Sequence, residues 1–258
     1  MPGFGFPMKV VRESIPAAQL AAVREPNKAE NLMPRYAEGI AERGSQKWLQ
    51  HLVNVKPELI NRDIAAFVPG INAEDIRWLS PARDDDYAEY RDRAFLRRLG
   101  LDLENVAHSE FWPRGGPVWD GLARAGPHFF LVEAKAHIPE LNTTRMKASQ
   151  KSSEQIIGSL QQTKEFLGSG THVDWAACFY QYANRIAHLH LLRNLNAVEA
   201  WLVNVYFVGD EEMGGPYSAE EWQGAIRLMK SHLGLGRHAL HNFEISLFFD
   251  VREFKLAS

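Results

Sequence analysis

Residues 117–136 read PVWDGLARAGPHFFLVEAKA, and this stretch decides the fold. It predicts two β-strands joined by a tight turn at Gly126-Pro127, because two apolar runs flank a turn-forming pair of residues. The second run, residues 129–136, is apolar enough for a strand that is buried on both faces. We therefore expect a hairpin whose second strand lies in the interior of the protein.

Three ionisable residues interrupt these apolar strands. Glu133 and Lys135 are two positions apart, so strand alternation places both side chains on one face. Asp120 lies on the neighbouring strand. An unpaired buried carboxylate costs several kcal/mol or takes up a proton. A divalent cation held between the two carboxylates, with the Lys135 ammonium beside it, would remove that cost. A buried Glu133–Lys135 ion pair near an exposed Asp120 is the structural alternative.

The spacing of these residues resembles the motif of a known family. Asp120, twelve intervening residues and then Glu133-Ala134-Lys135 resemble the Asp…(Asp/Glu)-x-Lys motif of the PD-(D/E)XK nuclease superfamily. Trp119 stands where the motif's name has proline, but that proline ligates nothing. The resemblance implies a restriction-endonuclease-like α/β fold over roughly residues 84–208. Its core would be α-β-β-β-α-β, with a mixed sheet flanked by helices.

The resemblance also implies an activity, which is hydrolysis of phosphodiester bonds in nucleic acid, DNA in the first place, with Mg²⁺ or Mn²⁺. The side chains of Asp120 and Glu133 and the carbonyl of Ala134 would bind the metal ion. Lys135 would hold or deprotonate the attacking water and neutralise developing charge. Burial would lower the pKa of Lys135, whereas the nearby carboxylates would raise it.

Glu89 is a further candidate, because it falls on a helix predicted between Asp84 and Leu99 and ended by Gly100. That placement resembles the first core helix of Holliday-junction resolvases in the same superfamily. By this resemblance, Glu89 would hold a second metal ion or a water molecule. On the same helix it would alternatively pair with Arg93, four residues later.

Supporting residues are predicted on three further segments. The helix expected over 173–195 carries a polar stripe that either lines the active-site cleft, with Arg185 on a phosphate, or forms an internal hydrogen-bond network. Gln155 lies on a helix expected over 152–167, where relatives carry a supporting glutamine. His137 follows Lys135 and either orients a metal-bound water or marks where the strand leaves the sheet. The stripe comprises Gln181, Asn184, Arg185 and His188.

The remaining pattern predicts how the chain is divided. Residues 1–80 are expected to be a helical N-terminal elaboration, with a loose arm over 1–16 and helices over 17–25, 34–54 and 57–67. Gln46 and Gln50 are interpreted as a solvated helix face. Residues 81–258 would hold the α/β core in one compact domain, with further strands over 106–112, 198–208 and 243–251, and a helix that starts at the capping box of Ser218 and Glu221.

Composition limits the classes of function. The formal net charge is −3, so contact with nucleic acid must come from a local basic patch. Cys178 is the only cysteine, which excludes an intrachain disulfide and a cysteine zinc cluster and fits a reducing compartment. We find no signal peptide and no apolar run long enough to span a membrane, and we expect a cytoplasmic protein.

Two other functions remain open. The first is a nuclease-fold module that binds nucleic acid or serves a structural role without catalysis, which the acidic charge balance favours. The second is a glycoside hydrolase in which Asp120 and Glu133 form the carboxylate pair, with Trp112 and Trp119 as a sugar platform. Lys135 argues against the second, because glycoside hydrolysis has no need of a lysine there.

Overall fold

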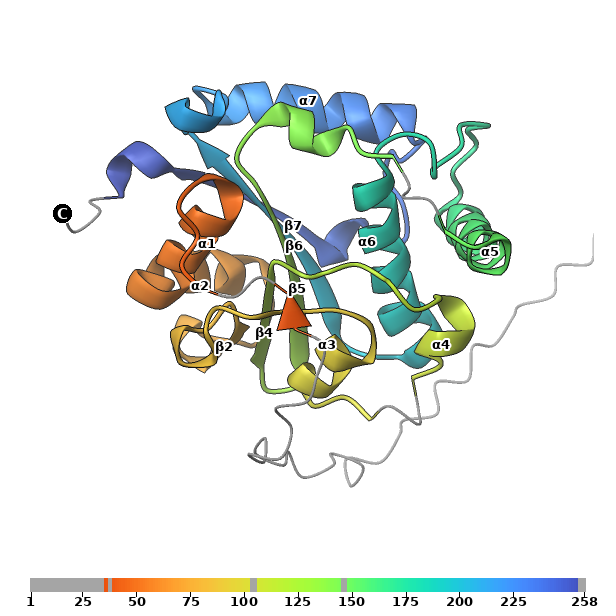
Figure 1. Cartoon of the computed structure of the whole chain (residues 1–258), viewed down its shortest axis with the longest axis horizontal. Coiled ribbons are helices and arrows are strands. Elements are labelled where there is room, and N and C mark those ends of the chain that lie inside the picture. The colour runs from red at the N-terminus through yellow and green to blue at the C-terminus, as the bar shows by residue number, and fades with distance from the viewer. Residues whose placement is uncertain (1–34, 37–38, 103–105, 145–147, 255–258) are drawn as a thin grey trace, which may run out of the picture.

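The computed structural model describes residues 35–36, 39–102, 106–144 and 148–254. Its centre is a five-stranded mixed sheet in the order β2-β4-β5-β6-β7 (Figure 1). The first three strands run antiparallel to one another, whereas β5, β6 and β7 are parallel. The strands are β2 (Arg77–Ser80), β4 (Gly121–Ala125), β5 (His128–Lys135), β6 (Ala200–Val208) and β7 (Glu244–Asp250). Two short strands, β1 (Arg35–Tyr36) and β3 (Glu89–Tyr90), form a separate antiparallel pair.

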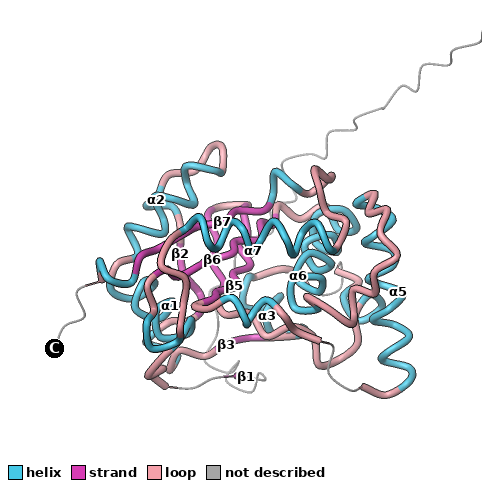
Figure 2. Tube along the Cα trace, turned by 90° about the horizontal axis from the view of Figure 1, so that it is seen from above, coloured by secondary structure: helices cyan, strands magenta, loops and turns pink. Residues whose placement is uncertain are grey.

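Helices cover both faces of the sheet, so the described chain is an α/β/α sandwich (Figures 1 and 2). One face carries α1 (Gly44–Val55) and α2 (Pro57–Phe67). The other face is covered by α3 (Asp92–Leu99), α4 (His108–Phe111), α5 (Gln150–Leu167), α6 (Tyr180–His190) and α7 (Ala219–His232). Among these described helices, none is both long and apolar enough to cross a membrane.

The two central strands alternate between the two layers of helices. On β6, Trp201, Val203, Val205 and Phe207 alternate along the strand and share a core with α1 and α2. On β5, Leu131 faces the other core. Because helices cover both faces of the sheet, the sequences of these strands are nearly continuous apolar runs.

The predicted hairpin is confirmed. β4 and β5 pair antiparallel from Gly121↔Val132 to Ala125↔His128, which leaves Gly126 and Pro127 as the two turn residues. Gly126 takes a φ of +54°, a conformation that costs glycine little.

The strand predicted over 106–112 is wrong. Residues 108–111 form α4, and Val106, Phe111 and Trp112 are buried in the helical core. The first strand of the sheet is β2 instead, which pairs with β4 and lies within residues 1–80. That range is therefore not an added helical unit, because it supplies one strand and the α1–α2 layer of the same sandwich.

The helix predicted from Asp84 is also wrong in its first half. Residues 83–85 form a 3₁₀ turn, and Asp86 and Tyr87 follow with φ of +51° and +56°. The chain then extends through β3 before α3 begins at Asp92, and the helix ends at Gly100 as predicted. Glu89 is thus a strand residue, and its helical pairing with Arg93 does not arise.

Helix boundaries differ elsewhere too. The helix expected over 34–54 begins only at Gly44, and the helix expected over 173–195 begins at Tyr180 and continues into a π-helical turn over 191–195. The helix over 57–67 and the later strands agree with the prediction. The expectations for residues 1–25 lie outside the described residues.

We expect Leu131→Ala to lower the free energy of unfolding by about 2–5 kcal/mol, because it opens a cavity at a fully buried position of β5. Leu228 on α7 is 68% exposed, so Leu228→Ala is the matched control and should change stability by less than about 0.5 kcal/mol. Urea unfolding followed by circular dichroism measures both, and equal losses would contradict the burial of β5.

Candidate functional site

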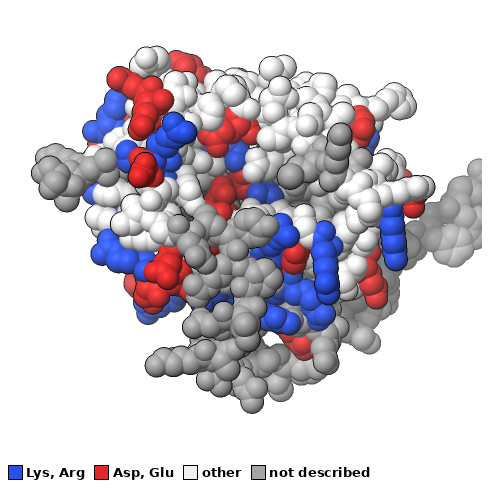
Figure 3. Space-filling view, in the orientation of Figure 1, with Lys and Arg blue, Asp and Glu red and all other residues white. Residues whose placement is uncertain are grey.

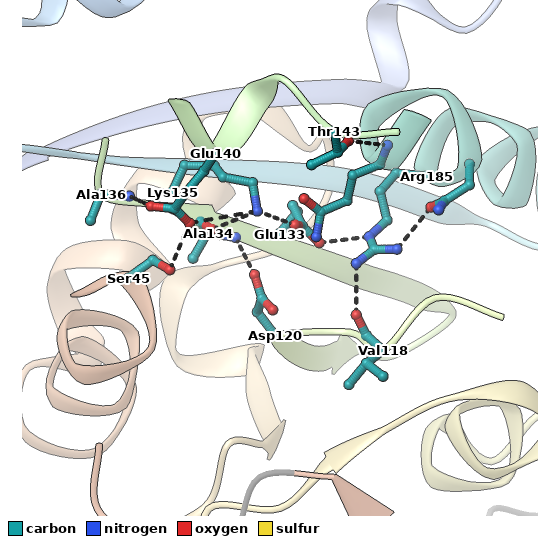
Figure 4. Close-up of polar contacts among 12 residues, drawn as sticks. Ser45, Val118, Asp120, Glu133, Ala134, Lys135, Ala136, Glu140, Thr143 and Arg185 are labelled. Carbon is teal, nitrogen blue, oxygen red and sulfur yellow. Dashed lines mark hydrogen bonds and ion pairs between the residues drawn. The ribbon is translucent and has the colours of Figure 1, made fainter. Parts of the chain in front are cut away.

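The hairpin brings three of the predicted site residues together (Figure 4). Asp120 directly precedes β4, and its Oδ2 accepts a hydrogen bond of 2.7 Å from the backbone N–H of Ala134. Glu133 and Lys135 lie on one face of β5, where the Lys135 ammonium donates to Glu133 Oε1. The pairing of β4 with β5 thus fixes the Asp120 side chain beside this ion pair.

Glu133 is held by two cations at once. Its Oε2 accepts a hydrogen bond of 2.6 Å from Arg185 Nε, while Oε1 faces Lys135. Burial alone would raise the pKa of Glu133, but the charges of Arg185 and then Lys135 outweigh burial and lower it. Glu133 is therefore a permanent anion inside the protein.

Arg185 is fixed in turn by the elements around it. Its guanidinium donates to the carbonyl of Val118 at 2.7 Å and to the side chain of Asn184 at 2.8 Å, and it lies 4.8 Å from the ring centre of Trp119. Of the two roles considered for this residue, the contacts match the internal network. Arg185 connects α6 to the segment before β4.

Lys135 is charged rather than neutral. Burial would lower the pKa of its ammonium, but the negative charges of Glu133, Asp120 and Glu140 raise it. The ammonium also donates to the carbonyl of Ala134 at 3.2 Å. Lys135 is therefore suited to donate hydrogen bonds and stabilise negative charge, and unsuited to remove a proton from water.

Glu89 and Asp120 have raised pKa values. Antiparallel bridging between Tyr90 and Trp119 brings β3 beside the residue that precedes Asp120. Burial, followed by the charges of Asp120 and Glu133, raises the pKa of Glu89 from 4.5 to about 8. Burial and then Glu133 raise the pKa of Asp120 from 3.8 to about 7. Glu89 is buried and Asp120 half-buried near other negative charge, an arrangement that a bound cation would relieve.

The first turn of α1 completes one side of the site. The side chain of Gln46 donates to Glu89 Oε1 at 3.2 Å, and Gln50 is buried. The interpretation of Gln46 and Gln50 as a solvated face is therefore wrong. Gln50 accepts from the backbone N–H of Ala41 and donates to the carbonyl of Gly39, so both glutamines bond protein groups.

Sequence reasoning missed Glu140. It lies in a 3₁₀ turn over Ile138–Leu141, where Oε1 accepts from the backbone N–H of Ala136 at 3.0 Å and contacts His137 Nδ1 at 2.5 Å. Its Oε2 accepts from Ser45 Oγ at 3.3 Å and lies 4.0 Å from Lys135 Nζ. The capping pattern of His137 with Glu140 three residues later was the available signal.

A pocket with about 320 Å³ of empty space, part of it open to solvent, is lined by Glu133, Lys135 and Glu140 but not by Glu89 or Asp120. The pocket lies between the end of β5, α6 and β6. Figure 3 shows acidic side chains at the centre of this face of the molecule. The residues that line the pocket are Glu133, Lys135, Glu140, Leu141, Gln181, Tyr182, Arg185, Asn204 and Tyr206. Gln181 and Arg185 thus lie with Glu133 and Lys135, as the polar stripe predicts.

Gln155 is placed away from the pocket, whereas His137 marks where the strand leaves the sheet, as one of its two interpretations predicts. Gln155 donates to the carbonyls of Ser109 and Glu110 at 2.9 and 3.0 Å and so joins α5 to α4, away from the pocket. His137 lies beyond the end of β5, where Glu140 holds it, and so does not share the strand face of Glu133.

His188 is a core residue. It is fully buried, with its ring centre 4.8 Å from that of Trp112 and 6.0 Å from that of Trp119. Burial, followed by the neighbouring His108, holds the pKa of His188 well below its usual value. An uncharged histidine packed among aromatic rings supports the fold instead of lining the pocket.

Comparisons of the chain with protein-family models, curated proteins and solved structures found no match.

The raised pKa of Glu89 predicts how stability depends on pH. The folded protein holds this proton more tightly than the unfolded chain, so the stabilisation is complete below about pH 4.5 and is lost as the pH rises to about 8. In metal-free buffer, the free energy of unfolding of Glu89→Gln should fall less over this range than that of the wild type. Urea titrations at several pH values measure the difference.

Glu154→Gln, at an exposed position of α5, is the control, and its free energy of unfolding should show the wild-type pH dependence. If Glu89→Gln and the wild type gave parallel curves, Glu89 would not have the raised pKa described above.

Proposed function

We propose that this protein is a divalent-metal-dependent nuclease that hydrolyses phosphodiester bonds in nucleic acid, with DNA as the first candidate. The observation that carries the proposal is that the bridge between Tyr90 and Trp119 brings the segments of Glu89 and Asp120 side by side, and that both acids have raised pKa values near the charged Lys135. Buried acids of this kind beside a lysine suit metal-assisted chemistry on a phosphodiester.

The order of elements supports the resemblance to the PD-(D/E)XK superfamily. Once β2 replaces the strand expected over 106–112, the succession α2-β2-β4-β5-α6-β6 gives helix, three antiparallel strands, helix and a parallel strand. With β3, α3, α4 and α5 treated as additions, this succession supports the proposed α-β-β-β-α-β core. The motif residues stand at the start of β4 and the end of β5.

Asp120 and Glu89 would hold the metal ion. Asp120 uses Oδ2 for Ala134, and Glu89 uses Oε1 for Gln46, so each has a second oxygen to offer. Mg²⁺ keeps several waters and is held in many proteins by only one or two carboxylates. Within the described residues, no three Asp, Glu, His or Cys side chains are grouped to hold a metal ion together, which fits a site of few protein ligands.

When bound, the metal ion would polarise a phosphoryl oxygen and lower the pKa of a water molecule. The Lys135 ammonium would donate a hydrogen bond to a phosphoryl oxygen as negative charge develops on it. Glu133 holds this ammonium in place, and Arg185 holds Glu133. Because Lys135 is protonated, it would not accept the proton of the attacking water, which would go to a carboxylate of the site instead.

A second candidate is a nuclease-fold module that binds nucleic acid without cutting it. The observation that favours it is that Lys135 and Arg185 already hold both oxygens of Glu133. The charge of that acid is thereby balanced with no metal ion present. The Ala134 carbonyl, expected as a ligand, likewise accepts from Lys135.

Cleavage of mixed DNA and RNA substrates in Mg²⁺ or Mn²⁺ tests the proposal. We expect Lys135→Ala to lower kcat by about 10²–10³-fold, because it removes the donor to the developing negative charge. Lys164→Ala on α5 is the control and should retain wild-type cleavage. Binding without cutting by the wild type would favour the module, and activity on an aryl glycoside alone would favour the glycoside hydrolase.

Metal binding should also appear in thermal unfolding. We expect Mg²⁺ to raise the melting temperature of the wild type, because the ion binds only the folded carboxylate site. Asp120→Asn should abolish this increase while leaving the protein folded in metal-free buffer. An equal increase in both proteins would mean that Mg²⁺ binds elsewhere.

A further inference from the structure

Exposed arginines gather beside the candidate site, although the whole chain carries a net charge of −3. Arg93 and Arg97 are four positions apart on α3, so their side chains lie on the same helix face, and both are exposed. Arg114 is exposed in the turn that leads to β4. We call these three residues the arginine face. Figure 3 shows Lys and Arg side chains gathered over this part of the molecule, next to the central acidic side chains.

Backbone contacts fix Arg114 relative to α3. The backbone N–H groups of Gly115 and Gly116 donate to Asp92 Oδ1, at 3.2 and 2.8 Å, which docks the turn on the first residue of α3. Further along, the N–H of Trp119 donates to the carbonyl of Tyr90 at 3.0 Å. The same two segments that carry the arginine face therefore also carry Glu89 and Asp120.

Among the described exposed residues between 91 and 118, the three arginines of the arginine face outnumber the two acids, Asp102 and Glu110. Asp92 accepts hydrogen bonds from the backbone of the turn. Arg98, the inward arginine of α3, lies 3.2 Å from Asp85 and packs on the ring of Tyr90. The arginines that project from α3 and the turn are therefore those of the arginine face. A local patch of this kind is the electrostatic footprint expected for contact with phosphates.

We propose that the arginine face holds the backbone of the nucleic acid strand whose scissile phosphate lies at Asp120 and Lys135. This inference rests on the proposed function and assigns its substrate-binding surface. Arg93 is four residues from Glu89 and Arg114 is six residues from Asp120, so their Cα atoms lie within at most about 14 and 21 Å of the site. At about 3.4 Å per phosphate along a strand, these contacts fall within roughly six nucleotides of the cut.

The test replaces the arginine face together, as Arg93→Gln, Arg97→Gln and Arg114→Gln. The control triple variant, Arg62→Gln, Arg227→Gln and Arg237→Gln, changes the net charge equally at exposed positions on α2, α7 and the segment after α7. Fluorescence anisotropy with labelled single-stranded and duplex DNA in Ca²⁺ gives Kd at several salt concentrations. Cleavage assays in Mg²⁺ give KM and kcat.

For the arginine-face variant we expect KM and Kd to rise at least tenfold, and the slope of log Kd against log salt to fall by about 2 to 3. The fall in kcat should be much smaller, because no residue of the face is assigned to the chemistry. The control variant should bind and cut as the wild type does.

Equal KM values and equal salt slopes in the two triple variants would contradict the proposed role of the arginine face and leave the nuclease proposal intact. A wild type that neither binds nor cuts DNA or RNA would overturn both. Matching melting temperatures for the two variants establish that a change in binding is not a loss of folding.

Discussion

The carboxylate of Glu133 is buried between β5 and α6, and the rest of the site depends on how it is neutralised. Lys135 takes one of its oxygens and Arg185 takes the other. Removing either cation would leave a buried charge without its partner, which typically costs about 3–5 kcal/mol. Because Arg185 also donates to Val118, the same ion pair joins α6 to the segment that delivers Asp120. Stability of the sandwich and geometry of the site are therefore linked.

The hairpin and its acid–lysine constellation could be predicted from the sequence, since both follow from local rules. Strand alternation places Glu133 and Lys135 on one face, and the turn at Gly126 sets the pairing that carries Asp120 to Ala134. The β6 alternation was readable for the same reason. What alternation alone could not give is the balance between burial and charge that keeps Lys135 protonated, to which Glu133, then Asp120 and finally Glu140, from a separate turn, contribute.

The errors in the prediction have a common physical cause, which is that tertiary packing overrode local pattern. The apolar run over 106–112 packs against α5 and α6 as a helical turn, while β2, only four residues long, has no alternation to reveal it. The acidic run before Glu89 resembles a helix start, yet Asp85 is held by Arg98 and Tyr90, and the helix begins seven residues later. Glu89 nevertheless reaches the site, through strand pairing instead of a helix face.

We propose that a divalent cation binds between the carboxylates of Glu89 and Asp120, beside the Lys135 ammonium. Anomalous diffraction from a crystal soaked in Mn²⁺ tests it directly. The account predicts a manganese peak within bonding distance of both carboxylates, with Glu133 still held by Arg185. A Mn²⁺-soaked crystal with no peak at these two side chains, or with its only peak elsewhere on the protein, would contradict it.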